Sequence, residues 1–273
     1  MIELAWRLLE TGRCRHPEAS SRIGAPWKPC EFPALVALLE HPNHGWILFD
    51  TGYGQAFMDA TRRLPESLYR AVTPVSWKPA EAAAAQLARD GLGADSIAHV
   101  ILSHFHGDHA GALPDFPRAK VWCAEAGWQE LHGRARLSAL AKGLLPALAP
   151  ESIAPRLKFI EHAPRMRLAA ELAPFDAGFD LFADGSIIAV PLPGHATGHF
   201  GIVFRERGRW IFLVADAAWS QRAIAENTPP PRWATGLLGD TPSYRRTLAD
   251  LHALAARRTN VLLVPAHCRS ARA

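Results

Sequence analysis

Five short, largely apolar runs set the strongest limit on the fold of this chain. They are Trp46–Phe49, Ala98–Leu102, Ile187–Leu192, Trp210–Val214 and Val261–Val264. Runs of this length with so little polar alternation are typical of strands buried on both faces, as in a sheet covered by helices. A residue with a metal-ligating side chain follows each run: Asp50, His104, His195, Asp216 and His267. Because loops at strand ends carry the sites of layered α/β proteins, we expect a functional site there.

Helices and loops are expected between these strands. The predicted helical stretches are Pro79–Arg89, Glu125–Leu148 and Tyr244–Arg257, the last with Thr241 or Ser243 as its cap. The longest predicted loop is Asn227–Gly239, and Ala163–Asp184 is interpreted as a connector. We therefore expect residues 1–273 to form one domain of two pseudo-equivalent halves, with a boundary near residues 163–184.

The bulk composition is that of an ordinary globular protein. The chain has 273 residues, 49% hydrophobic and 21% charged, and a net charge of +4. Its scattered arginines fit a solvated surface, so we expect a small-molecule substrate and no nucleic acid. No apolar run reaches about 18 residues and the start lacks a secretory apolar core, so we expect no membrane span and a cytoplasmic location. The four cysteines form no CxxC pair and are expected to be packed, reduced thiols, Cys268 included.

The segment HFHGDHAG, residues His104–Gly111, carries the central chemical signal. The pattern H-x-H-x-D-H is expected by chance in about one sequence of this composition in a thousand, so it is a specific match. Three imidazoles and a carboxylate within six residues are poorly suited to a core or to an ordinary surface loop. They suit zinc, which binds imidazole nitrogen and carboxylate oxygen.

Four ligands from one short loop leave no room for substrate on a single tetrahedral ion, so the sequence predicts two ions. Alternate residues of a tight turn share a direction, which allows His104 and His106 to serve one ion while Asp108 and His109 serve the other. The remaining ligands are expected from the strand ends, namely His195, Asp216 and His267. The two oxygens of the Asp216 carboxylate allow it to bridge both ions.

The order of short motifs resembles the metallo-β-lactamase superfamily. The motifs are DTG (Asp50–Gly52), HFHGDH (His104–His109), PGHATGH (Pro193–His199), AD (Ala215-Asp216) and PAH (Pro265–His267), and they span residues 46–267. The resemblance implies an αββα sandwich, in which two mixed sheets lie face to face with helices outside. It implies a first metal site of His104, His106 and His195, a second site of Asp108, His109 and His267, and Asp216 as the bridge. Asp50 and His199 would orient ligands without binding metal.

The same resemblance implies hydrolysis with two divalent ions. Zinc is expected, and manganese, iron or cobalt fit the same ligands. A hydroxide bridging the ions, available because the ions lower the pKa of water to about 7, would attack a carbonyl or phosphoryl centre. Asp108 would pass a proton to the leaving group.

The spacing of DTGYG, SHFHGDHAG, PGHATGH and ADAAW is most similar to quorum-quenching lactonases. Trp219 stands where those acyl-homoserine-lactone hydrolases generally have a tyrosine, so the predicted substrate is a lactone or another carboxylic ester. The expected pocket residues are Tyr53, Phe105, Trp219 and Trp233. Three alternatives stay open: a glyoxalase II-type thioesterase, an iron-dependent persulfide-type oxygenase, and a metal-binding domain without catalysis.

Overall fold

The computed structural model describes residues 2–236, 238–257 and 260–271, and the chain divides into two compact units. The first unit comprises residues 5–16 and 29–158. The second unit comprises residues 2–4 and 17–28 together with the described residues from 159 onward. Each unit is built on its own sheet.

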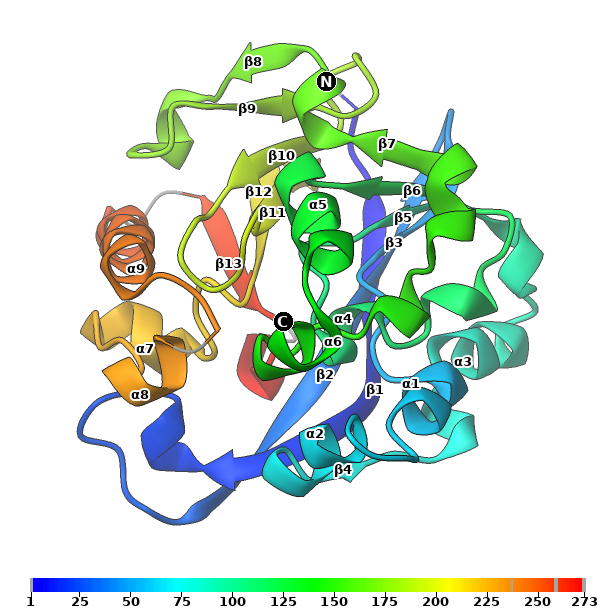
Figure 1. Ribbon diagram of the computed structural model, residues 1–273. Helices are drawn as coiled ribbons and strands as arrows, with labels where there is room; N and C mark the ends of the chain where they lie inside the picture. The colour runs from blue at the N-terminus through cyan, green and yellow to red at the C-terminus, as the bar shows by residue number, and fades with distance from the viewer. Residues whose placement is uncertain (1, 237, 258–259, 272–273) are drawn as a thin grey trace. The chain divides into compact units, whose positions relative to one another are not determined.

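A mixed seven-stranded sheet forms the first unit. Its strands are β1 (Ala5–Pro17), β2 (Pro29–His41), β3 (Gly45–Phe49), β4 (Val75–Ser76), β5 (Ile97–Ile101), β6 (Lys120–Cys123) and β7 (Leu157–Phe159). They are ordered β4-β1-β2-β3-β5-β6-β7, and β3, β5 and β6 run parallel to one another (Figure 1). The helices of this unit are α1 (Gln55–Ala60), α2 (Ser67–Val72), α3 (Ala83–Arg89), α4 (Gly107–Ala110), α5 (Glu125–Gly133) and α6 (Arg136–Ala141).

The register of β3 against β5 positions the first group of predicted ligands. Phe49 lies opposite Ile101, and the backbone N–H of Asp50 donates to the carbonyl oxygen of Ile101 at 2.8 Å. Parallel strands end at the same edge of a sheet. Asp50 and the loop that begins at Ser103 therefore emerge side by side.

The second unit contains a mixed six-stranded sheet. Its strands are β8 (Arg165–Arg167), β9 (Ala177–Asp180), β10 (Ile188–Pro191), β11 (Phe200–Glu206), β12 (Arg209–Ala215) and β13 (Val261–Pro265). They are ordered β13-β12-β11-β10-β9-β8 and are antiparallel except for the parallel pair β12 and β13. The helices are α7 (Gln221–Glu226), α8 (Arg232–Thr235) and α9 (Thr241–Ala256). Because β10, β12 and β13 all run in the same direction, the residues that follow them meet at one edge.

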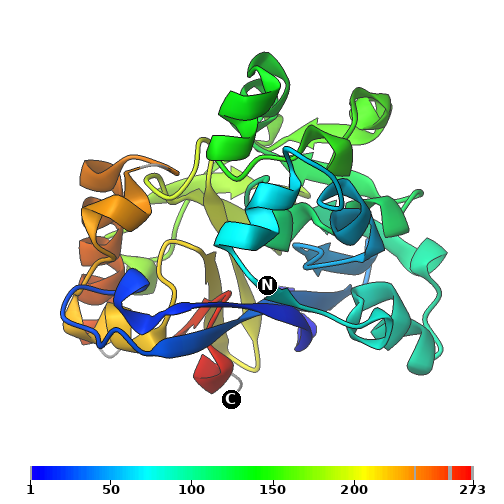
Figure 2. The same ribbon diagram turned by 60° about the horizontal axis from the view of Figure 1, so that its bottom comes forward.

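Helix α9 covers part of the second sheet with one apolar face. Tyr244, Leu248, Leu251 and Leu254 recur at three- and four-residue spacing and are buried, as expected for an amphipathic helix. They share a core with sheet residues such as Phe212. The orange helices α7, α8 and α9 stay beside the yellow strands of this unit in both views (Figures 1 and 2).

The five predicted strands are all present, each with bounds shifted by no more than one residue at either end. The predicted helix over Glu125–Leu148 is wrong as one element. Arg134 is extended, Gly143 has a φ of 71°, and residues Pro146–Leu148 form a separate 3-10 turn. Local breaks of this kind divide the stretch into α5, α6 and the turn.

Three smaller expectations also change. The cap of α9 is Asp240, whose carboxylate accepts from the Ser243 backbone N–H at 3.0 Å, so the predicted caps Thr241 and Ser243 are wrong. The predicted connector Ala163–Asp184 contains β8 and β9, and the predicted loop Asn227–Gly239 contains α8. Among the described residues, no helix combines the length and apolar character needed to cross a membrane.

Candidate metal centre

The loop after β5 holds four of the predicted ligands. His104, His106 and His109 are 2%, 5% and 1% exposed, and Asp108 is half-buried. His106 immediately precedes α4, and this short helix brings the ring centroid of His109 to 4.1 Å from that of His104. The Nε2 atom of His104 and the Nδ1 atom of His106 are 3.0 Å apart. The first unit thus gathers three imidazoles and one carboxylate in a small volume.

Asp50 orients two of these histidines, His109 directly and His104 through Ser103. Its Oδ1 accepts from the Ser103 backbone N–H at 2.8 Å, and its Oδ2 accepts from Ser103 Oγ at 2.9 Å and His109 Nδ1 at 2.8 Å. Because an ionised carboxylate can only accept, His109 carries its proton on Nδ1 and keeps the Nε2 lone pair for a metal. Ser103 Oγ gives its proton to Asp50 and accepts from His104 Nδ1 at 3.0 Å. The lone pair of His104 is therefore on Nε2, as it is in His109.

The ligand loop requires glycine at position 107. A Cβ atom there would lie 2.6 Å from a ring carbon of Phe57 and 3.3 Å from the hydroxyl oxygen of Tyr69. Phe57 is fully buried and packs its ring edge-on against Tyr69, with centroids 5.3 Å apart. The aromatic pair therefore holds the backbone between His106 and Asp108 from one side.

The second unit brings together the other three predicted ligands. His195, Asp216 and His267 follow β10, β12 and β13. His195 Nε2 lies 3.1 Å from Asp216 Oδ2, and His267 Nε2 lies 3.1 Å from Asp216 Oδ1. His267 Nε2 also lies 3.2 Å from Asp216 Oδ2, so two imidazoles share one carboxylate.

His199 positions the backbone of Asp216 through hydrogen bonds. Its Nδ1 lies 2.8 Å from the carbonyl oxygen of Leu192, and its Nε2 lies 3.1 Å from the backbone nitrogen of Asp216. Since the carbonyl can only accept and the backbone N–H can only donate, His199 is neutral with its proton on Nδ1. Both ring nitrogens are occupied, so His199 positions Asp216 and has no lone pair left for a metal.

The loop that carries His195 is packed tightly on α9. Gly194 has a φ of 129°, and a Cβ atom there would lie 2.1 Å from the backbone nitrogen of Tyr244. Burial, followed by the charge of Asp216, raises the pKa of Tyr244 well above its usual range. The Tyr244 phenol therefore stays protonated at neutral pH.

Two predicted pocket residues are buried in the first unit. Tyr53 is fully buried, with its ring centroid 4.9 Å from that of Phe57. Phe105 is 3% exposed, and its centroid lies 6.1 Å from that of Trp128. Within this unit both side chains pack as core.

The two predicted pocket residues of the second unit differ in their surroundings. Trp219 lies edge-on to His195 and His267, with ring centroids 6.1 and 6.4 Å away. Trp233 is 56% exposed and stacks on Trp27 at 5.8 Å. Trp219 thus borders the predicted ligands, whereas Trp233 belongs to an exposed aromatic pair. Its partner Trp27 was not predicted from the sequence.

Cys268 is a free, half-buried thiol. Its Sγ accepts from the Gln221 backbone N–H at 3.5 Å and lies 3.0 Å from Ser270 Oγ. These contacts fit a packed thiol beside His267.

The donor atoms fit divalent metal ions. Two ligands at about 2.0–2.1 Å on one tetrahedral zinc ion lie roughly 3.3 Å apart. The separation between His104 Nε2 and His106 Nδ1 is 3.0 Å, and His195 and His267 each lie 3.1 Å from a carboxylate oxygen of Asp216. Imidazole and carboxylate donors at such spacing are typical of zinc, iron or manganese sites.

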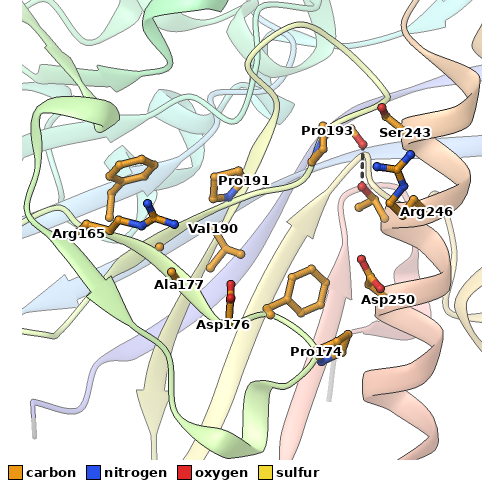
Figure 3. A pocket seen from close by; sticks show the side chains of 14 residues that line it. Arg165, Pro174, Asp176, Ala177, Val190, Pro191, Pro193, Ser243, Arg246 and Asp250 are labelled. Carbon is orange, nitrogen blue, oxygen red and sulfur yellow. Dashed lines mark hydrogen bonds between the residues drawn. The ribbon is translucent and has the colours of Figure 1, made fainter.

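A cavity of about 450 Å³ lies elsewhere in the second unit, between β9, β10 and the start of α9 (Figure 3). Its walls include Pro193, whose carbonyl oxygen accepts from Thr247 Oγ1 at 2.7 Å. No predicted ligand lines this cavity. It borders the loop that carries His195 without containing the candidate centre.

These features define the class of this protein. It is an α/β protein with two mixed sheets flanked by helices, and the loops at its strand ends carry histidines and aspartates suited to bind metal. Residues 31–267 match the sequence profile of the Metallo-beta-lactamase superfamily. The chain belongs to this superfamily, and the predicted family and αββα fold class are both confirmed.

Similar proteins include named hydrolases. The N-acyl homoserine lactonase AiiB of Agrobacterium fabrum is 28% identical over 271 residues, which cover 94% of this chain and 91% of that protein. The probable metallo-hydrolase Rv2300c of Mycobacterium tuberculosis is 30% identical over 191 residues, which cover 68% of this chain. The matched part of the chain spans only 57% of the length of that relative. A solved N-acyl homoserine lactone hydrolase with bound N-hexanoyl-L-homoserine has a TM-score of 0.71 at 17% identity, covering 99% of this chain and 95% of that chain, and shows the same fold.

Proposed function

We propose that this chain is a dinuclear-metal-dependent hydrolase that opens a lactone or cleaves another carboxylic ester, with zinc as the expected metal. The observation that carries the proposal is the carboxylate of Asp216, which lies 3.1 Å from the Nε2 atoms of both His195 and His267. That is the arrangement expected of a carboxylate bridging two ions. The similarity to AiiB, a named lactonase, supports the choice of substrate.

The ligand assignment follows the family likeness. One ion would be held by His104, His106 and His195, the other by Asp108, His109 and His267, and Asp216 would join both. When bound, two such ions supply Lewis acidity and lower the pKa of coordinated water to about 7.

The chain's own residues would hold and move protons around these ions. Asp50 and His199 keep their neighbouring ligands in fixed orientations through the hydrogen bonds described above. The side chain of Asp108 is 14% exposed, against 1% for Asp50 and 4% for Asp216, so Asp108 is the group proposed to pass a proton to the leaving alcohol. Trp219 would form part of the substrate wall. A single domain over residues 1–273 and a cytoplasmic location remain predictions.

The test combines elemental analysis of purified protein with turnover assays on aliphatic lactones, aryl esters and thioesters, before and after chelation. About two zinc ions per chain with chelator-sensitive lactone or ester turnover would support the proposal. A preference for thioesters would favour the glyoxalase II-type alternative. A single iron ion without hydrolysis would overturn the dinuclear mechanism, and two bound ions without any turnover would leave a binding domain.

A matched pair of variants connects metal content to the assigned ligands. His106→Ala removes a proposed ligand and is expected to lose metal and turnover together. His252→Ala removes a half-buried histidine of α9 whose Nδ1 lies 2.9 Å from the carbonyl oxygen of Ile224. This control is expected to keep both ions.

A further inference from the structure

The cavity of about 450 Å³ in the second unit carries charged groups on two walls (Figure 3). Arg246 and Asp250 line it from α9. Arg165 of β8 and Asp176, which immediately precedes β9, line it from the other side. Each wall thus supplies one cation and one anion. None of the seven predicted metal ligands is among the described residues that line the cavity, so this site is separate from the candidate metal centre.

One face of α9 forms the first wall. The helix residues that line the cavity recur at three- and four-residue spacing: Ser243, Arg246, Thr247 and Asp250. This spacing places side chains on the same side of a helix. Thr247 is buried and donates through Oγ1 to the carbonyl oxygen of Pro193 at 2.7 Å, which fixes the helix against the loop that follows β10. The wall therefore presents Arg246 and Asp250 from a fixed backbone.

The floor between the two walls is apolar. Val190 of β10 is 1% exposed, and Phe175 is half-buried with its ring edge-on to that of Phe212, at a centroid distance of 5.3 Å. Ala177 and Pro191 extend this floor. Covering such a surface with an apolar group is favourable because it removes apolar area from water. The cavity thus combines an apolar floor with charged walls.

The charged groups of the walls are open to a ligand. Both arginines and Asp176 are exposed, and Asp250 is half-buried. Among the residues that the structure describes, neither arginine lies within ion-pair distance of an acidic side chain. Hydrogen bonds from Ser243, followed by the charge of Arg246, lower the pKa of Asp240, so Arg246 acts on this helix cap only at longer range. A ligand can therefore pair with the walls without breaking an existing ion pair.

The charges are separated across the floor. In Figure 3 the guanidinium groups of Arg165 and Arg246 lie towards the top of the cavity, and the carboxylates of Asp176 and Asp250 lie towards the bottom. A ligand with a single charge would meet groups of its own sign on one side. A ligand with one negative and one positive group meets opposite charges on both sides. The arrangement therefore favours a zwitterion.

We propose that this cavity binds a free α-amino acid with an apolar side chain. Its carboxylate faces the two arginines, its ammonium group faces the two aspartates, and its side chain lies on Val190 and Phe175. Either end of a peptide chain carries only one of these two charges and pairs with only half of the site. The inference goes beyond the proposed hydrolase function and requires no metal ion.

The test is an NMR titration of the isotope-labelled protein, as purified, with L-phenylalanine. The backbone amide signals of Gly178 and Thr247 report on this site because both residues line the cavity. Glycine, which lacks a side chain to cover the floor, should bind at least about tenfold more weakly. N-acetyl-L-phenylalanine and L-phenylalanine amide each lack one charge and should bind about two- to fivefold more weakly.

Charge variants locate the two ends of the ligand. Arg246→Met should weaken the binding of L-phenylalanine about two- to fivefold and leave the binding of its amide, which lacks the carboxylate, unchanged. Asp176→Asn should weaken the binding of L-phenylalanine and leave the binding of the N-acetyl form, which lacks the ammonium group, unchanged. Arg245→Met is the control, because Arg245 is exposed on the same helix and does not line the cavity.

A steric variant tests the cavity itself. Ala177→Trp fills it from β9 and should weaken the binding of L-phenylalanine at least about tenfold, because the ligand side chain loses the floor. Ala253→Trp is the control, because Ala253 is exposed on α9 and does not line the cavity. Circular dichroism checks that both variants fold.

Three results would overturn the proposal. The first is the absence of saturable L-phenylalanine binding in the millimolar range. The second is equal binding by the two tryptophan variants, or equal effects of Arg246→Met and Arg245→Met. The third is binding of the N-acetyl form or the amide as tight as that of the free amino acid, which would assign the cavity to a peptide end. Hydrolysis and metal content enter none of these readouts, so the proposed function is tested separately.

Discussion

Replacing Asp50 by asparagine should weaken metal binding without unfolding the chain. Asp50 is 1% exposed and accepts three hydrogen bonds, two from Ser103 and one from His109 Nδ1. An amide of the same shape offers one accepting oxygen and one donating nitrogen. If the oxygen keeps the Ser103 backbone N–H, the amide nitrogen faces Ser103 Oγ and His109. The serine hydroxyl can rotate to accept, and His109 must then accept at Nδ1.

The magnitude follows from this exchange of donor and acceptor. His109 would move its proton to Nε2, the atom that needs a free lone pair to bind a metal. Changes to residues that orient metal-ligating histidines lower metal affinity by about 10–100-fold. That range corresponds to about 1.4–2.8 kcal/mol of binding free energy. The packing around position 50 is unchanged, so the fold of the apo protein should persist.

Metal affinity is measured by competition with a chromogenic chelator, and folding by circular dichroism and thermal unfolding of the apo protein. Asp180→Asn is a matched control, because Asp180 is 7% exposed and its Oδ2 accepts from the Gly185 backbone N–H at 2.8 Å in the second unit. This control should bind metal as wild type does. If Asp50→Asn bound both ions with wild-type affinity, the assignment of Asp50 as the residue that fixes the His109 proton would be refuted.

Three further outcomes are expected. Burial, together with the charge of Lys120, lowers the pKa of His99 to about 4. In the unfolded chain the pKa of this histidine is near 6.5, so the unfolded state takes up the proton first and stability is lost as pH falls from about 6.5 towards 4. His99→Gln should flatten this dependence of Tm on pH. Gly107→Ala places a Cβ atom 2.6 Å from the Phe57 ring and should cost about 1–3 kcal/mol in urea unfolding, partly recovered by Phe57→Leu in the same chain. Asp216→Asn leaves one accepting oxygen for two ions, and elemental analysis should show the loss of at least one ion per chain.

The strands and the ligand loop could be predicted from sequence because their signals are local. The runs before Asp50, His104 and Asp216 are largely apolar, and a polar residue follows each of them within two positions. Periodicity finds such elements without knowledge of what packs on them. The grouping of ligands within each unit followed from parallel strands ending at the same sheet edge.

The stretch from 125 to 148 could not be predicted, because its breaks depend on tertiary contacts. Gly143 adopts a positive φ and packs on the ring of His106, far away in sequence. Leu144 then pairs with His106 as a backbone bridge. Helix propensity in this segment is high, yet the positive φ of Gly143 and the bridge of Leu144 to His106 prevent the helix from continuing.

Ser103 was also missed, although a signal was available. A serine between a buried strand and the first ligand histidine has a hydroxyl that can donate to one neighbour and accept from another. In the structure it donates to Asp50 and accepts from His104. Which carboxylate it meets depends on the register of β3 against β5, and a single sequence does not reveal that register.

The two units fix their ligands by different physical means. Asp50 acts through an ionised carboxylate, which holds the proton of His109 on Nδ1, the nitrogen that faces it, and leaves the lone pair on Nε2. His199 acts as a neutral ring between two backbone groups and fixes where the chain of Asp216 lies. A carboxylate behind Asp216 would repel it, whereas a neutral imidazole does not. The residue types at 50 and 199 are therefore dictated by the charge of the ligand that each supports: neutral histidine in the first unit and anionic aspartate in the second.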